Sequence, residues 1–210
     1  MSQTSTGESG FSTDHQLGDL IVIAGLTAVL FAGGLFLAEA PGELGLDIDW
    51  KPFFVVYAVI IFVPWGLPTV AAALGATFAE AFLDVAEGAA ADDPFGWVGY
   101  AVGFTAAGYI FGNDTSSTAK MAIGGTLGAL LQYAIEGLFL FAIGSEPGSV
   151  LGMQVSGAAP IYGIAVIGNT ITHGVILGFI PLIPTVGYLE GRIQRMFPLA
   201  AEDGREPAAD

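Results

Sequence analysis

Long apolar stretches alternate along this chain with short turns that are rich in acidic residues, glycine and proline. The first stretch, residues 20–38, holds nineteen residues and no charge. An uncharged apolar run of about 18 residues or more is long enough to cross a lipid bilayer as a helix. The pattern therefore predicts a membrane-spanning first helix.

Five further helices are expected after it. They cover residues 53–63, 69–85, 97–111, 119–143 and a last stretch from about residue 155 to Pro181 or beyond. Two prolines around a glycine at 64–68 predict a tight turn or a sharp kink. We interpret the flanking stretches as two helices, the first of them short; the alternative is one kinked helix.

The predicted fold class is an all-α integral membrane protein with six transmembrane helices over residues 17–195. A disordered acidic tail is expected at 1–16 and a second acidic tail at 196–210. Composition agrees, because 53% of the residues are hydrophobic, 12% are charged and the mean hydropathy is +0.69. Soluble domains carry about 25% charged residues.

Charge is strongly acidic, with 20 acids, five bases and a net charge of -15. Such a surface repels phosphate backbones, which argues against nucleic-acid binding. The excess of acids, with only two lysines, is typical of proteins from salt-loving archaea.

The few bases indicate an orientation. Six spans place both termini on one side, and if that side is cytoplasmic, one base lies outside and four lie inside: Lys51, against Lys120, Arg192, Arg195 and Arg205. This distribution agrees with the positive-inside bias. We therefore expect a multi-pass protein of the cell membrane with cytoplasmic termini.

Polar side chains within the apolar stretches are candidate ligand-binding residues, since a charge at a helix centre costs about 2.5–3.5 kcal/mol and faces protein or water. Glu80, Asp84 and Glu87 share one helical face. This face lines a cavity in the functional interpretation. In the alternative interpretation, Asp84 and Glu87 lie in water at the helix end.

The fifth and sixth stretches carry the other candidates. Gln132 and Glu136 lie one turn apart and can bind a ligand or another helix, and the same holds for Asn169 and His173. Polar contacts between helices are a common alternative to ligand binding. Trp50 is expected at the membrane interface, with stacking on a ligand as its functional role.

Ala24, Ala28 and Ala32 recur every fourth residue and make one face of the first helix almost flat. Small-residue faces let membrane helices approach closely. This face is a candidate docking surface for another helix.

These alanines, the segment 64–84 and the run 94–97 leading to 106–112 are similar to the substrate-binding (S) components of energy-coupling factor (ECF) vitamin transporters. The resemblance covers about residues 19–195. It implies six helices, an outward-facing pocket capped by the loop after the first helix, and docking of the alanine face onto a transmembrane coupling subunit. Two cytoplasmic ATPases would drive transport, so the chain itself would not be an enzyme, and it has no GxxxxGK[ST] loop.

Metal transport and cofactors are not expected. Cobalt and nickel members of the family carry His at the second position, where this chain has Ser2, and His15 and His173 are far apart in sequence. With no cysteine, thiolate metal sites are impossible. Carboxylates and amides within the helices favour a ligand with amine or hydroxyl groups.

Two other classes of function remain open. One is a stand-alone secondary transporter or ion-conducting protein that uses Glu80, Glu136 and His173 as a proton or cation path. Such transporters often contain internal repeats, and none is evident. The other is a structural subunit of a membrane complex, in which the carboxylates would have no ligand.

Overall fold

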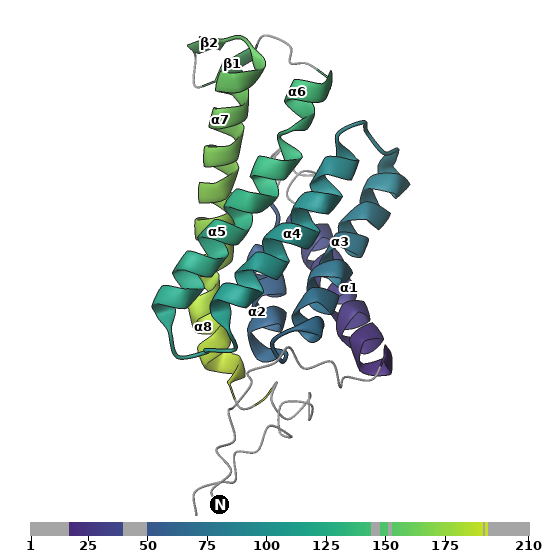
Figure 1. Cartoon of the computed structure of the whole chain (residues 1–210), viewed down its shortest axis with the longest axis vertical. Coiled ribbons are helices and arrows are strands. Elements are labelled where there is room, and N and C mark those ends of the chain that lie inside the picture. Colours follow the sequence, from purple (N-terminus) through teal and green to yellow (C-terminus); the bar gives the residue numbers. More distant parts are fainter. Residues whose placement is uncertain (1–16, 40–49, 144–147, 151–152, 191, 193–210) are drawn as a thin grey trace, which may run out of the picture.

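The computed structural model describes residues 17–39, 50–143, 148–150, 153–190 and 192, which form a helical bundle with one small hairpin (Figure 1). In chain order the elements are α1 (Leu17–Glu39), α2 (Phe53–Phe62), α3 (Leu67–Glu87), α4 (Asp93–Phe111), α5 (Thr118–Glu136), α6 (Phe139–Ile143), β1 (Gly148–Val150), β2 (Met153–Val155), α7 (Ala158–Asn169), the π-helical segment η2 (Thr170–Phe179) and α8 (Ile180–Leu189). The two predicted acidic tails lie outside these residues.

In the described part of the chain, four helices are long and apolar enough to cross a membrane: Leu17–Leu37, Leu67–Glu87, Thr118–Ala142 and Ala158–Leu189. This confirms the helical class and supports a membrane protein. α2 is apolar but has only ten residues, and the nineteen-residue α4 is not among the four. Six membrane spans therefore remain a prediction.

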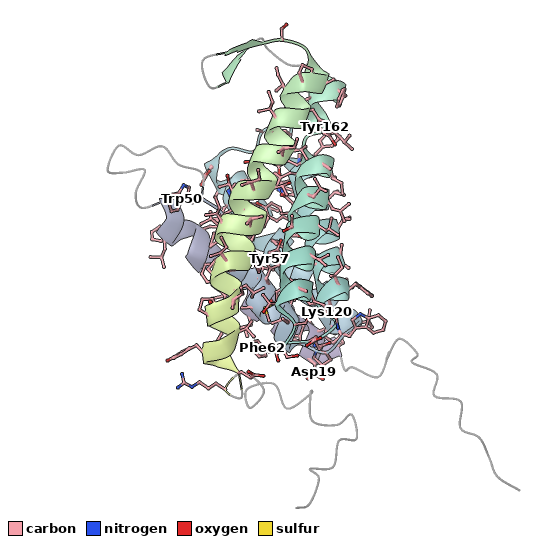
Figure 2. All side chains as sticks on the ribbon, turned by 90° about the vertical axis from the view of Figure 1, so that its left-hand side faces the viewer. Asp19, Trp50, Tyr57, Phe62, Lys120 and Tyr162 are labelled. Atoms are coloured by element: carbon pink, nitrogen blue, oxygen red, sulfur yellow. The ribbon has the colours of Figure 1, made fainter. Side chains whose placement is uncertain are left out.

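Successive helices run up and down the bundle, so the start of α1 and the end of α8 lie at the same end (Figure 1). Figure 2 shows Asp19, Phe62 and Lys120 toward this end and Trp50 well away from them, toward the other end. We call these the terminal end and the distal end of the bundle.

The proline-flanked turn separates two helices, as interpreted from the sequence. Val63 is extended, with φ -83° and ψ 151°, and Gly66 has a positive φ of 108° that a side chain would strain. The Asn113 side-chain amide donates to the carbonyl oxygens of Ile61 and Val63. These bonds satisfy carbonyls that lack helical partners at the end of α2.

The later elements differ from the prediction. The expected helix 119–143 is interrupted after Glu136, and the loop that follows α6 contains the antiparallel hairpin β1–β2. The last helix instead begins at Ala158 and continues through Pro181 and Pro184 to Leu189. Its η2 segment keeps the backbone bonded with wider turns, for example from the Ile180 amide to the Val175 carbonyl.

α2 is short because it lies inside the bundle, where it contacts α1, α3, α4, η2 and α8. Eight of its ten residues are buried. Around it, glycines let the longer helices approach closely: a methyl group added at Gly99 of α4 would lie 2.5 Å from the Gln132 carbonyl oxygen of α5. The α4–α5 pair is thereby packed backbone against backbone.

Candidate functional site

A cavity of about 110 Å³ lies beside Trp50, which Figure 2 shows in the direction of the distal end. It is lined by residues at the end of α1, before α2 and along the last turns of α3: Leu35, Trp50, Lys51, Glu80, Leu83, Asp84 and Glu87. A neighbouring cavity of about 40 Å³ shares three of these residues and reaches α4 and α5: Lys51, Glu80 and Asp84, with Asp92, Asp93, Gly96, Tyr100 and Glu136. The two cavities form the candidate site.

An ion pair lies between the cavities. Lys51 Nζ is 2.7 Å from Glu80 Oε1, and the Glu80 side chain is only 7% exposed. The same carboxylate oxygen accepts a hydrogen bond of 3.1 Å from the Tyr100 hydroxyl. Lys51 Nζ also lies 5.6 Å from the centroid of the Tyr100 ring, within the range of a cation–π contact. Segments before α2, in α3 and in α4 thus meet at one ammonium group.

A second carboxylate is held one helical turn away. The Trp97 indole N–H donates to Asp84 Oδ2 at 2.7 Å, which joins α3 to α4. Asp84 is half-buried and lines both cavities. Glu87, one turn further, is exposed at the rim.

Glu136 reaches the smaller cavity from α5. It accepts a hydrogen bond from the side-chain amide of Gln132, and Gly96 of α4 lies beside its carboxyl group. Gln132 is fully buried, and its Oε1 has no hydrogen-bond partner. Gln132 and Glu136, which lie one helical turn apart, therefore form a hydrogen-bonded pair in which Gln132 Oε1 accepts no hydrogen bond.

An aromatic cluster lies beside the ion pair. Phe53 packs against Tyr100 with ring centroids 5.8 Å apart and stacks on Tyr133 at 6.0 Å with an interplanar angle of 8°. The Tyr133 hydroxyl lies 2.7 Å from His173 Nδ1, both side chains are buried, and the His173 ring also packs 5.6 Å from Phe53. His173 therefore belongs to a buried polar pair next to the site.

The predicted site residues thus fall into three groups. Glu80, Asp84, Glu136 and Trp50 line the cavities, and Trp50 is 48% exposed. Gln132 contacts the cavity-lining Glu136, and His173 contacts Tyr133; neither Gln132 nor His173 lines a cavity. Asn169 is half-buried at the junction of α7 and η2 and lines neither cavity.

The alanine face of α1 packs within the chain. Ala24, Ala28 and Ala32 are half-buried against the core, and a methyl group added at Gly75 of α3 would collide with the Ala24 carbonyl oxygen. α1 packs chiefly against α3. A partner subunit would reach these alanines only at the edge of the face, and their role in coupling stays a prediction.

Sequence reasoning did not assign Lys51, Tyr100 or Trp97 to the site. The sequence predicted an outside position for Lys51 but no role in the site, and it assigned no role to Trp97 beyond the run 94–97. One signal was available for Lys51: it is the only Lys or Arg before residue 120. A lone base among several membrane-embedded acids is a natural partner for one of them.

The cavities carry an excess of negative charge, since six carboxylates and one ammonium line them. Within the described part of the chain, no three His, Cys, Asp or Glu residues are grouped to hold a metal ion. The arrangement suits an organic cation or a hydrogen-bond donor.

Comparisons with protein-family models, curated proteins and solved structures gave no match to this chain. The candidate site therefore rests on its own geometry.

Proposed function

We propose that the protein is the membrane-embedded substrate-capture subunit of an ECF-type importer and that it binds a vitamin-like small molecule in the distal cavities. The observation that carries the proposal is the pair Lys51–Glu80, which is largely buried at the wall of a cavity in an otherwise apolar bundle. Ionisable groups in such positions are costly to bury and mark substrate or ion pathways.

The position of the cavities supports capture from outside the cell. Lys120 lies in the first turn of α5, toward the terminal end (Figure 2), and Arg192 follows α8, which ends there (Figure 1). Trp50, the residue before Lys51, lies well away from Lys120 in the direction of the distal end (Figure 2). The positive-inside bias then favours a cytoplasmic terminal end and an outward-facing distal end. In this orientation Trp50 and Lys51, which precede α2, line the cavity on its outward side.

The exposed side of α1 is the surface we assign to the coupling subunit. Gly25 and Gly33 have no neighbouring atoms within 4 Å of an added methyl group, and Val29 between them is 71% exposed. This side is continuous around the helix with the predicted alanine face. A second helix can approach closely where side chains are small.

The test is affinity purification of the full chain from its native membrane. We expect a transmembrane coupling subunit and two ATPases to co-purify. Gly25→Leu and Gly33→Leu should lower their recovery about tenfold or more, because a leucine separates the helices. Gly168→Leu is the matched control, since this exposed glycine of α7 also has open space around it. Recovery of the chain alone, or uptake that continues without the ATPases, would contradict the proposal.

The Tyr133–His173 pair favours one rival, a proton-coupled secondary transporter. Hydrogen-bonded His side chains inside membrane helices are common parts of proton relays in transporters. The purified chain alone, reconstituted in liposomes, would then accumulate substrate in response to a pH gradient. The importer proposal expects no accumulation without the coupling subunit and ATPases.

A further inference from the structure

The ion pair in the cavity wall indicates what kind of ligand fits. We propose that the site binds a molecule with a protonated amine and that this ammonium group replaces the Lys51 ammonium on Glu80. The inference rests on the proposed function, because it names the substrate class of the same cavities.

The first argument is the geometry around Lys51 Nζ. One carboxylate oxygen lies 2.7 Å away, and an aromatic face lies 5.6 Å from the same nitrogen. The Tyr100 hydroxyl, bonded to Glu80 Oε1, holds this carboxylate in place. A carboxylate combined with an aromatic ring is the arrangement by which proteins recognise ligand ammonium groups. Lys51 thus occupies an ammonium-binding subsite.

Charge supplies the second argument. Among the described residues, five carboxylates besides Glu80 line the two cavities, from Asp84, Glu87, Asp92, Asp93 and Glu136, and Lys51 is the only basic residue of this described lining. A bound cation reduces the electrostatic repulsion between these carboxylates, whereas a bound anion would be repelled by them. A ligand cation is therefore favoured even while Lys51 stays nearby.

Size and ligand geometry narrow the class further. The larger cavity, at about 110 Å³, has room for roughly four water molecules at about 30 Å³ each. The ammonium group of a ligand and the few carbon atoms next to it fit this space. The described carboxylates do not converge as metal ligands, so an organic cation is favoured over a divalent metal.

The position of Lys51 allows its side chain to move away from Glu80. It lies directly before the N-terminal cap of α2, outside any helix, and its side chain is 18% exposed. A lysine stem is flexible and carries its charge to water readily. The ligand therefore competes with a tethered cation, and removal of that cation should strengthen binding.

The test uses two probes of equal size, 2-phenylethylammonium and 2-phenylethanol, with the purified full chain in nanodiscs of neutral lipid. Calorimetry should show the ammonium binding at least about tenfold more tightly than the alcohol, because a hydrogen bond to a charged group is the stronger one. Lys51→Met should raise ammonium affinity about tenfold and leave alcohol affinity unchanged. Glu80→Gln should abolish the preference.

Asp19→Asn is the control, because it makes the same charge change at the opposite end of the bundle (Figure 2). It should retain the preference for ammonium. Lys51→Arg keeps the positive charge and should bind the ammonium with the affinity of the wild type. This variant shows whether the effect of Lys51→Met on affinity comes from the lost charge. Equal affinity of the wild type for both probes, no binding of either, or an unchanged preference in Glu80→Gln would overturn the inference. Recovery of the coupling subunit and ATPases is a separate measurement, so the proposed function can stand if this inference fails.

Discussion

Replacing Gly75 with alanine tests the contact between α1 and α3, which forms one wall of the larger cavity. In the structure a methyl group at Gly75 would point directly into the backbone of α1. The Ala24 carbonyl carbon and Cα would lie 2.8 and 2.9 Å from it. Carbon atoms normally pack at about 3.5–4.0 Å. α1 would therefore have to move away by about 0.6–1.2 Å.

The magnitude follows from two opposing effects. Overpacking of a close contact costs about 1–3 kcal/mol, and here the upper part of that range applies because a helix backbone cannot rotate away as a side chain does. Alanine also favours the helix over glycine by about 1 kcal/mol. The net loss in the free energy of unfolding should be about 1–2 kcal/mol, which is a factor of about 5–30 in the unfolding equilibrium.

The assay is reversible unfolding of the purified protein in mixed micelles, followed by tryptophan fluorescence. Gly25→Ala is the matched control on α1, because a methyl group there meets no atom within 4 Å. It should be neutral or stabilising by up to about 1 kcal/mol. If Gly75→Ala were as stable as Gly25→Ala, α1 and α3 would not be in contact at this position and the reasoning would be refuted.

Three further predictions concern single polar contacts. Tyr133→Phe should destabilise the fold by about 1–3 kcal/mol in the same unfolding assay, because His173 loses a buried partner; an unchanged stability would sink the proposed pair. Ser117→Ala should cost about 0.5–2 kcal/mol by removing the N-terminal cap of α5, and Ser117→Gly only a few tenths; equal losses would exclude a capping role. The hydrogen bond from the Ser116 hydroxyl lowers the pKa of Asp114 from its ordinary value of 3.8 to about 2. The stabilisation by this carboxylate is therefore complete above about pH 3.8 and is lost as the pH falls through 2. Asp114→Asn should be less stable than the wild type at pH 5 and equal to it near pH 2, and a constant difference would contradict this.

Local pattern was sufficient to locate the helices. The first helix, expected at 20–38, is Leu17–Glu39, and the short apolar run at 53–63 forms Phe53–Phe62. The proline-rich turn separates two helices as interpreted. These features are local because an apolar segment must satisfy its backbone hydrogen bonds within itself, and proline and glycine act on their own residues.

The later elements show where local pattern is incomplete. The last helix reaches beyond Pro181, as expected, whereas the break after Glu136 and the hairpin β1–β2 after α6 were not predicted. Pro181 follows η2, whose wider turns adjust the hydrogen bonding around the missing amide hydrogen, and the Thr185 hydroxyl donates to the Pro181 carbonyl at 2.7 Å. Such compensation depends on neighbours along the helix and on packing, and neither is visible in apolar periodicity.

The sequence predicted the acidic residues of the candidate site but not their partners. The helical spacing of Glu80 and Asp84 correctly predicted one face, and both residues line the cavities. Their partners Lys51, Tyr100 and Trp97 come from other segments, and Lys51 is 29 residues from Glu80. Pairing across such distances depends on the rotation and depth of whole helices, which a single sequence does not encode locally.

The sequence by itself determined that this is a helical protein with membrane-length apolar segments, a small-residue face on its first helix and acids at sites where they are costly. Only the tertiary structure decided that the alanine face meets Gly75 within the chain, that α2 is enclosed by other helices, and that Lys51 sits on Glu80 at a cavity. The physical reason is that helix formation is decided by hydrogen bonds within a segment, whereas the choice of partner is decided by close packing and charge pairing between segments.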